Sequence, residues 1–250
     1  MSEHPPIPES PPANGGTPIH LRPTAELAER ALLPGDPGRA LALAQALLEK
    51  PLMFNHHRGL WGYTGMAADG EPLTIQSTGM GGPSAAIVLH ELIALGVRRA
   101  IRVGTCGGLD ASLALGDLVV AGEAIAADGT SQALGIASRA PGTDARVAAD
   151  DELTASLTRT GVADAAATVV STDLFYDPRG RREQDWLAAG AVAVEMEAAT
   201  LFALGARSQV QVACVLAVSD LLGEGRVRID DERLESAAQR MGEAAIAALS

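Results

Sequence analysis

The sequence predicts an α/β fold, a three-layer α/β/α sandwich around a mixed central sheet. Segments with the periodicity of strands alternate with segments of helical periodicity along most of the 250 residues. Hydrophobic residues make up 47% of the chain and aromatic residues only 3%, so we expect a large core of aliphatic side chains. We find no internal repeat and no second domain boundary, and therefore expect one domain.

The first half of the chain predicts a strand, a helix and a hairpin, followed by a second helix and two strands. Pro and Gly at 34–37 indicate a tight turn, and Asp69-Gly70 is a typical hairpin turn. Gly96 closes the second helix. The expected elements are a strand near 27–33, a helix at 40–48, a hairpin within 59–79, a helix at 84–96, a strand at 98–109 that runs into a Gly-rich turn, and a strand at 116–126.

The second half begins with a segment of loop composition at 138–150 and continues the alternation. The near-continuous apolar run at 211–220 predicts a buried strand. The expected elements are a helix at 151–161, a strand at 167–176, a helix at 181–190, a short strand and a helix within 191–207, the buried strand, a loop at 222–230, and a final amphipathic helix with Leu234, Ala238, Met241, Ala245 and Leu249 on one face.

The N-terminal segment differs from the rest of the chain, because it is rich in Pro and Gly and lacks the apolar core of a signal peptide. We expect residues 1–16 to form a disordered arm and residues 17–250 to form the single domain. The chain contains no run of 18 apolar residues, so we expect no transmembrane helix. These features predict a cytoplasmic protein.

The formal net charge of −12 disfavours nucleic acid and anionic membranes as partners. Lys50 is the only lysine, and no Gly-Lys-Ser/Thr sequence follows a Gly-rich segment, which excludes a P-loop. Cys106 and Cys214 form no pair motif, and His56 and His57 are adjacent, which is poor geometry for shared chelation. We therefore expect no metal site, and a solvated turn at the two histidines.

Residues capable of chemistry cluster where the predicted strands end. In an open α/β sheet, ligands bind beyond the carboxyl ends of the strands. Six such ends carry polar, charged or Gly-rich segments, and together they predict a single site. These segments are 35–39, 78–84, 102–108, 171–176, 195–197 and 219–220.

Two of these segments predict an anion site. Gly79, Gly81 and Gly82 precede a helix, whose free N–H groups and dipole favour an anion. A simple tight turn is the alternative. Arg102 lies in an otherwise apolar strand, and a buried guanidinium needs an anionic partner. That partner is either a bound anion or an internal carboxylate, for example Glu197.

Acidic side chains at two other strand ends predict ligand binding or proton transfer. Glu195 and Glu197 lie two residues apart at a strand end and therefore face the same way, so they can bind hydroxyl groups of a ligand. The alternative is a helix N-terminus that carries acids. Asp220 ends the long apolar strand, where a poorly solvated carboxyl suits a general acid. An N-cap for the next segment is the alternative there.

Six motifs resemble those of one enzyme family and occur in its order and at its spacing. They are PGDPGR, STGMGGPS, RVGTCGG, STDLFY, VEMEAA and VSD. From about Thr17 to the C-terminal helix, the chain resembles the nucleoside phosphorylase family that includes bacterial hexameric purine nucleoside phosphorylases and uridine phosphorylases. The resemblance implies a partly barrel-like sheet. It also implies cleavage of a nucleoside by phosphate to free base and (deoxy)ribose 1-phosphate, in nucleoside salvage or catabolism, without a metal or organic cofactor.

The resemblance assigns roles to residues at matching positions. Phosphate would be bound by Gly35, Arg39, Arg58, Arg102 and Thr105. Ribose would be bound by His20, Met80, Met196 and Glu197, and the base by Phe175, Ser219 and Asp220. Asp220 would be the general acid, with Arg233 beside it as the second catalytic residue. Protonation of the purine at N7 by Asp220 would neutralise the leaving base.

Two positions favour a purine substrate over uridine. Ser219-Asp220 stands where uridine phosphorylases carry an Asn-Arg pair, and no Gln follows Phe175-Tyr176. The motif STGMGGPS and Thr105 are partly uridine-like, so the phosphate region does not discriminate. Uridine phosphorylase therefore remains the alternative.

Three further classes of protein are alternatives: a methylthioadenosine phosphorylase, a nucleosidase and a non-catalytic nucleoside-binding protein on the same fold. The arginine cluster argues against a hydrolase, because attacking water needs no guanidinium groups. The intact acidic and basic site residues argue against a non-catalytic protein.

His20 and Arg58 resemble residues that family members lend to a neighbouring subunit. This implies that the active unit is at least a dimer. By resemblance, we expect a homo-oligomer with shared active sites, a hexamer built as a trimer of dimers.

Overall fold

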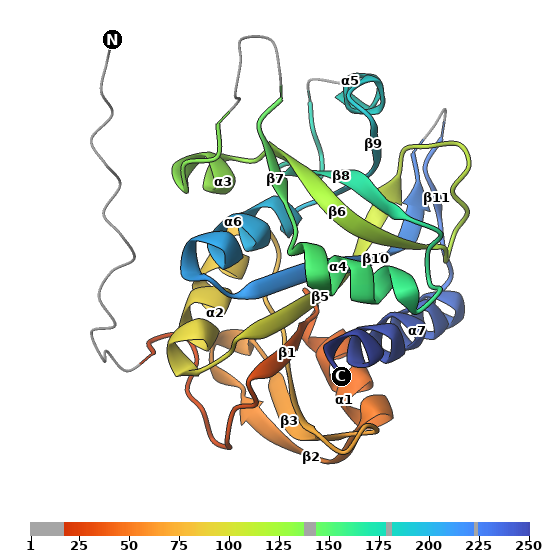
Figure 1. Cartoon of the computed structure of the whole chain (residues 1–250). Helices are drawn as coiled ribbons and strands as arrows, with labels where there is room; N and C mark the ends of the chain where they lie inside the picture. Colours follow the sequence, from red (N-terminus) through yellow and green to blue (C-terminus); the bar gives the residue numbers. More distant parts are fainter. Residues whose placement is uncertain (1–17, 138–143, 179–181, 223–224) are drawn as a thin grey trace, which may run out of the picture.

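The computed structural model describes residues 18–137, 144–178, 182–222 and 225–250 (Figure 1). The disordered arm predicted at residues 1–16 lies outside these ranges, as does part of the loop predicted at 138–150. Among the described residues, no helix is both long and apolar enough to cross a bilayer.

The central sheet is mixed, and part of it closes on itself. The strand order is β11-β10-β6-β8-β9-β5-β1-β4-β3-β2, with β7 paired to β6. An additional pairing of β10 with β5 closes β10, β6, β8, β9 and β5 into a barrel, which confirms the partly barrel-like sheet. The strands are β1 Arg30–Leu33, β2 Leu48–Asn55, β3 Gly62–Ala67, β4 Pro72–Gln76, β5 Arg99–Gly108, β6 Leu118–Ala127, β7 Arg146–Ala148, β8 Ala166–Thr172, β9 Ala191–Glu195, β10 Gln211–Leu221 and β11 Val227–Arg228.

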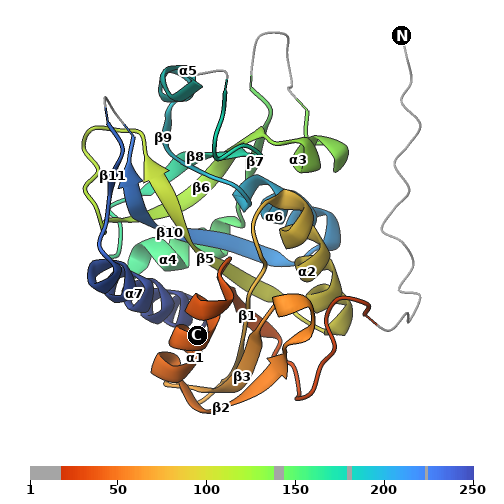
Figure 2. The ribbon, with the colours of Figure 1, turned by 180° about the vertical axis from the view of Figure 1, so that it is seen from behind.

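Helices cover the sheet on both faces, as Figures 1 and 2 show. On one face α2 packs on α6 and α3, and on the other α7 packs on α1 and α4. A mainly aliphatic cluster fills the space under each group, which confirms the predicted three-layer sandwich and its aliphatic core. The helices are α1 Pro37–Leu47, α2 Gly82–Leu95, α3 Gly129–Ala133, α4 Asp151–Arg159, α5 Arg182–Ala188, α6 Ala198–Ser208 and α7 Asp231–Leu249, with a short 3-10 helix at His57–Gly59.

Local sequence signals explain where several elements begin and end. The carboxylate of Asp36 accepts a hydrogen bond from the N–H of Gly38, and Pro37 occupies the first position of α1, so the predicted turn caps this helix. Gly96 ends α2 with a φ of 124°, a backbone conformation that favours glycine. The hairpin predicted around Asp69-Gly70 is the β3–β4 hairpin.

The prediction of a Gly-rich turn at the end of the strand 98–109 is wrong. Residues up to Gly108 continue β5, and Gly107 pairs with Asp220 of β10 and with Val194 of β9. A Cβ on Gly107 would lie 2.9 Å from a methyl group of Leu222. Glycine at this position therefore allows close packing between β5 and Leu222, and the cluster of glycines here does not indicate a turn.

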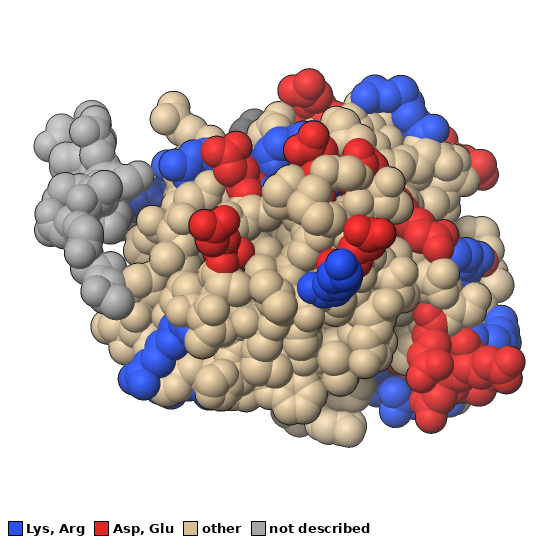
Figure 3. All heavy atoms as spheres, turned by 90° about the horizontal axis from the view of Figure 1, so that it is seen from below, with Lys and Arg blue, Asp and Glu red and all other residues tan. Residues whose placement is uncertain are grey.

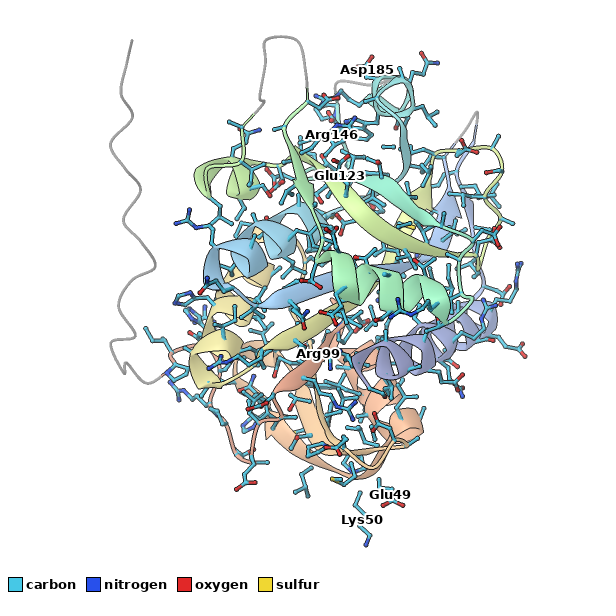
Figure 4. All side chains as sticks on the ribbon, viewed as in Figure 1. Glu49, Lys50, Arg99, Glu123, Arg146 and Asp185 are labelled. Carbon is cyan, nitrogen blue, oxygen red and sulfur yellow. The ribbon has the colours of Figure 1, made fainter. Side chains whose placement is uncertain are left out.

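Three strands lie where none was predicted, namely β2, β7 and the short strand β11 within the predicted loop at 222–230. β2 follows α1 directly, and it escaped prediction because an edge strand tolerates a proline such as Pro51 and two register shifts. β7 lies in the segment predicted as a loop and pairs with β6. There Arg146 forms an ion pair with Glu123 at 2.7 Å, and both side chains are labelled in Figure 4. The strand predicted at 167–176 ends earlier, at Thr172.

Arg30 and Asp69 form a bidentate ion pair that joins the start of β1 to the β3–β4 turn. Nη1 and Nη2 of Arg30 donate to the two carboxylate oxygens of Asp69 at 2.5 and 2.6 Å. The hydroxyl of Ser250 donates to the same carboxylate. The hydrogen bonds from Arg30 outweigh the effect of partial burial and hold the pKa of Asp69 below its ordinary value.

Asp69→Asn is expected to destabilise the protein by about 3 kcal/mol at neutral pH, because Arg30 loses its counter-charge in a buried position. Because the pKa of Asp69 is lower in the folded state, its carboxylate stabilises the fold at pH values above the ordinary pKa of 3.8. This contribution is lost progressively as the pH falls below that value. Urea unfolding of both proteins at about pH 7 and about pH 3 checks this prediction. The difference in unfolding free energy between wild type and Asp69→Asn should be smaller at the lower pH. An equal difference at both pH values would contradict the assigned role of this ion pair.

Candidate functional site

The six strand-end segments predicted to form one site all contribute to one cavity of about 1460 Å³. The loops that precede α1 and α2 meet here, because the N–H of Gly79 donates to the carbonyl of Gly35 at 3.0 Å. The predicted site residues that line the cavity are Gly35, Arg39, Met80, Arg102, Thr105, Phe175, Met196, Glu197, Ser219 and Asp220. His20, Arg58 and Arg233 do not line it.

Arg102 is a buried cation in the wall of this cavity. Its Nε donates to Oε2 of Glu195 at 3.0 Å, and its Nη2 lies 2.5 Å from Oε2 of Glu197. Burial lowers the pKa of Arg102, but the carboxylates of Glu197 and Glu195 more than compensate, so the pKa lies above its ordinary value. The internal salt bridge, which was the alternative explanation for Arg102, is therefore present.

One nitrogen of Arg102 remains unused by this salt bridge. Its Nη1 is buried and has no hydrogen-bond partner in the described part of the chain. Gly104 provides the space for the guanidinium, since a Cβ at position 104 would lie 2.7 Å from Cζ of Arg102. A buried donor without a partner is costly, so Nη1 is suited to an anion that enters the cavity.

The two carboxylates next to Arg102 have different roles. Glu195 accepts hydrogen bonds from the hydroxyl of Ser171 at 2.5 Å and from the N–H groups of Glu197 and Ala198 at 2.9 Å. Burial raises the pKa of Glu195, and the charge of Arg102 opposes this shift. Glu195 therefore binds the N–H groups at the start of α6. For Glu195, the alternative interpretation as an acid at a helix N-terminus is thus confirmed.

Glu197 connects Arg102 to the Gly-rich turn before α2. Its Oε1 accepts a hydrogen bond from the N–H of Gly81 at 2.5 Å. Gly81 precedes the first residue of α2 and has a φ of 86°, which favours glycine. Part of the anion-binding capacity predicted for this helix terminus is therefore already satisfied by a carboxylate of the protein itself.

Arg39 brings a second guanidinium to the cavity. It lies in the first turn of α1, and within the described residues it has neither a hydrogen bond nor an ion pair within 4 Å. Burial lowers the pKa of Arg39, Asp36 raises it, and the nearby charge of Arg102 lowers it again. Two neighbouring guanidinium groups with unused donors create a positive field that a small dianion would relieve.

Asp220 lies at a β-bulge in the cavity wall. The register between β10 and β5 shifts between Val218 and Asp220, so Ser219 has no direct partner on β5. Asp220 is 5% exposed, and its Oδ2 accepts a hydrogen bond from the hydroxyl of Ser219 at 2.8 Å. The N-cap alternative is wrong, because β10 continues to Leu221 and the N-cap of α7 is Asp230.

Aromatic and apolar side chains also line this cavity. Phe175 is 53% exposed and packs edge-to-face on Tyr176, with 4.9 Å between ring centroids. Trp186 and Leu187 of α5 also line the cavity. A flat heterocycle fits such a surface, since it can stack on Phe175 and exclude water from Asp220.

The prediction that Arg233 lies beside Asp220 is wrong in this structure. Arg233 belongs to the first turn of α7, is exposed, and donates to the carbonyl of Leu115 at 2.8 Å. Two arginines from the loop predicted at 222–230 contact Asp220 instead. Nε of Arg226 donates to Oδ1 of Asp220 at 2.8 Å, and Nε of Arg228 lies 3.3 Å from the same oxygen.

Sequence reasoning missed Arg226 and Arg228 because it treated residues 222–230 as a loop. Residues 223–224 lie outside the described ranges, and on either side of them the chain is a hairpin in which Asp220 pairs with Arg228. The sequence carries a signal for this arrangement, since glycines at 223 and 225 after a strand are typical of a hairpin turn.

His20 and Arg58 lie in a group of basic residues outside the cavity. Nδ1 of His20 is 2.7 Å from Oε1 of Glu91, which also accepts its backbone N–H. Arg58 is exposed and has a φ of 58°. Burial, followed by the charges of Arg22, Arg58, His56 and His20, lowers the pKa of His57. A short helical turn at His57–Gly59 therefore places the guanidinium of Arg58 among these basic side chains.

No set of three His, Cys, Asp or Glu side chains within the described ranges is arranged to hold a metal ion.

A model of the phosphorylase superfamily matches residues 29–250, so the chain belongs to this family. The purine nucleoside phosphorylase DeoD-type of Geobacillus kaustophilus is 38% identical over 215 residues, which cover 84% of this chain and 88% of the relative. Proteins of the same name from two clostridia are similarly close. The Clostridium perfringens (strain ATCC 13124) protein is 35% identical over 230 residues, 90% of this chain and 95% of its own, and the Clostridium novyi protein is 36% identical over 213 residues, 83% and 89%.

Proposed function

We propose that this protein cleaves the glycosidic bond of purine nucleosides with inorganic phosphate, releasing the free base and (deoxy)ribose 1-phosphate. Its relatives, matched over most of their length, are named purine nucleoside phosphorylases. The observation that carries the proposal is one cavity that holds two guanidinium groups with unused donors and a buried carboxyl group.

Phosphate is assigned to the region of Arg39, Arg102 and Thr105. It would accept hydrogen bonds from Arg39 and from Nη1 of Arg102, and Gly35 would let the backbone approach closely. There the phosphate would act as nucleophile on C1′ and as counter-charge to the cation that develops on the ribose. Met80, Met196 and Glu197 line the same cavity and would hold the ribose.

The base is assigned to the region of Phe175, Ser219 and Asp220. Phe175 would stack on the purine, and the carboxyl of Asp220 would donate its proton to N7 as the bond to C1′ breaks. Proton donation of this kind contributes a factor of about 10²–10⁴ to a rate. Phosphate is the nucleophile and the protein supplies the acid, so the proposed reaction requires no metal or organic cofactor.

The proposal includes an oligomer in which subunits share active sites, in the hexameric form that the resemblance implies. It is supported by the position of His20 and Arg58 outside the cavity, where they are available to a neighbouring subunit. It is also supported by exposed apolar side chains on β2 and β3. These side chains are Leu52, Met53 and Met66. In Figure 3, tan atoms cover most of the lower middle part of the face seen from below, and most charged side chains lie above it and to its right.

We also propose a cytoplasmic location. The cysteines Cys106 and Cys214 are both buried with free thiols, which fits a reducing compartment.

The experiment that tests the proposed function measures release of free base from inosine, adenosine and uridine, each with and without phosphate. Purines should be cleaved only with phosphate, because the guanidinium groups of the cavity bind an anion that water cannot replace. Cleavage of uridine alone would contradict the assignment of Asp220 as purine acid. Cleavage at equal rates without phosphate would identify a hydrolase and contradict the proposal.

A further inference from the structure

We propose that Glu91 is a positioning residue that fixes His20 as a hydrogen-bond acceptor for the 5′-hydroxyl of the ribose, and thereby sets a preference for nucleosides that carry this hydroxyl. Glu91 belongs to α2, and no motif of the sequence assigns it a role. The inference rests on the proposed function and on the proposed sharing of active sites, because His20 does not line the cavity of its own chain.

The carboxylate of Glu91 holds the backbone on both sides of His20. Its Oε2 accepts the N–H of Leu21 at 2.6 Å and that of His20 at 3.0 Å, and its Oε1 accepts the N–H of Ile19 at 3.1 Å. Glu91 is 8% exposed, and Leu21 is fully buried in the core. Figures 1 and 2 show this first described segment beside α2. The position of His20 is therefore determined by contacts with the core and with a buried carboxylate.

The same carboxylate determines which ring nitrogen of His20 carries a proton. Oε1 of Glu91 lies 2.7 Å from Nδ1 of His20. Burial raises the pKa of Glu91, but the hydrogen bonds from His20, Leu21 and Ile19 more than compensate, so this pKa lies below its ordinary value. An ionised carboxyl group only accepts hydrogen bonds, so Nδ1 must be the donor. In the neutral imidazole, Nε2 then has no proton and is an acceptor.

Nε2 of His20 is accessible to a ligand from outside the subunit. The side chain of His20 is 28% exposed, and within the described ranges its ring makes no hydrogen bond other than the one to Glu91. His20 belongs to the basic group that includes His57 and Arg58. A hydroxyl group is a suitable partner for this nitrogen, because its O–H can donate to an acceptor.

The chemistry of the ribose selects the 5′-hydroxyl as this partner. In the proposed reaction C1′ faces the phosphate at Arg39 and Arg102, and Glu197 of the same cavity is assigned to the ribose. The 2′- and 3′-hydroxyls are adjacent, so one carboxylate can bind both. The 5′-hydroxyl projects from the other side of the ring, on a flexible carbon, and is the group that can extend to a neighbouring subunit.

A preference among substrates follows from this arrangement. A nucleoside with hydrogen, fluorine or a thioether in place of the 5′-hydroxyl has no proton to donate at this position. Nε2 of His20 would then be left without a donor, which is unfavourable for an acceptor removed from water. We therefore expect such nucleosides to be cleaved less efficiently than inosine.

A matched pair of substrates, inosine and 5′-deoxy-5′-fluoroinosine, tests this role at about pH 8, where an imidazole is neutral. Fluorine has nearly the size of the hydroxyl group but donates no hydrogen bond. The measured quantity is the ratio of kcat/KM for inosine to kcat/KM for the fluoro compound. The intrinsic reactivities of the two nucleosides are the same for every variant, so a change in this ratio reports the contact at the 5′ position.

Glu91→Gln is expected to lower this ratio roughly 3- to 10-fold, mainly through a higher KM for inosine. The amide of Gln can donate to Nδ1, which places the proton on Nε2 and changes it from acceptor to donor. His20→Ala should lower the ratio roughly 3- to 30-fold. Glu91→Gln should lower it no further when His20→Ala is already present, because the two residues act through one contact. Glu235→Gln, at an exposed position of α7, is the control and should leave the ratio unchanged.

The tautomer can also be observed without any change at Glu91. Solid-state ¹⁵N NMR of the wild-type oligomer labelled at histidine should show His20 with a protonated Nδ1 and an unprotonated Nε2. His20→Ala identifies the signals of this residue. This measurement decides the question even if Glu91→Gln does not fold.

Three outcomes would overturn the inference. They are a protonated Nε2 in wild type at about pH 8, an unchanged ratio in His20→Ala, and equal losses on both substrates in Glu91→Gln, which would indicate a purely structural role. Failure of the proposed function is distinguishable from all three. In that case wild type cleaves neither nucleoside in the presence of phosphate, before any substitution is made.

Discussion

Asp220→Asn is expected to lower kcat for inosine phosphorolysis by about 10²–10⁴-fold, the largest effect on rate that we predict for a single substitution. The amide has nearly the volume of the carboxyl, and its oxygen can still accept the hydrogen bond from Arg226, so the site should keep its shape. It has no acidic proton to give to N7. Steady-state rates of base release, compared at saturating phosphate, measure the effect.

Two comparisons make this prediction specific. Asp220→Asn should cleave 7-methylinosine at close to the wild-type rate, because that base needs no proton. Asp151→Asn, at an exposed position in the first turn of α4, should leave both rates unchanged. Full activity of Asp220→Asn on inosine would show that the proton comes from another donor.

The position of the site could be predicted from the sequence because it follows from topology. The carboxyl ends of strands gather at one edge of an α/β sheet, so segments as distant as 35–39 and 219–220 were expected to meet. They do meet, in one cavity. The glycines of the motifs also indicate the position of the site. Gly104 and Gly107, however, are needed for close packing within β5 and do not form a turn.

The choice between neighbouring residues of the same type could not be predicted. Glu195 and Glu197 have the same charge and the spacing of residues on one strand face. Only the start of α6 at Ala198 turns N–H groups toward Glu195, while the close approach of Gly81 engages Glu197. The hydrogen bond that engages Glu197 joins residues 116 positions apart in the sequence, and no local pattern records such a contact.

The same limit explains the error at Arg233. The resemblance fixes a distance of 13 residues along the chain from Asp220, but distance in space depends on the path between them. The β10–β11 pairing returns the chain to Asp220 at Arg228, and α7 then begins at Asp231 and carries Arg233 to the loop at Leu115. A positive charge is still supplied to Asp220, but it comes from a different residue.

Arg102→Met is expected to destabilise the protein by about 3–5 kcal/mol, because it leaves two buried carboxylates without their counter-charge. Glu195 and Glu197 are 4% and 5% exposed, and Arg102 contacts both. This loss is a large share of the 5–15 kcal/mol that a folded domain typically has. Urea unfolding monitored by circular dichroism measures it.

The matched control is Arg146→Met, which breaks the ion pair with Glu123 between β6 and β7. Both of those side chains are about one third exposed, so we expect a loss below about 1 kcal/mol. Adding Glu195→Gln to Arg102→Met should recover part of the stability, since one uncompensated charge is removed while the hydrogen bonds from Ser171 and α6 can remain. Equal losses in Arg102→Met and Arg146→Met would mean that the buried network does not hold this end of the sheet together.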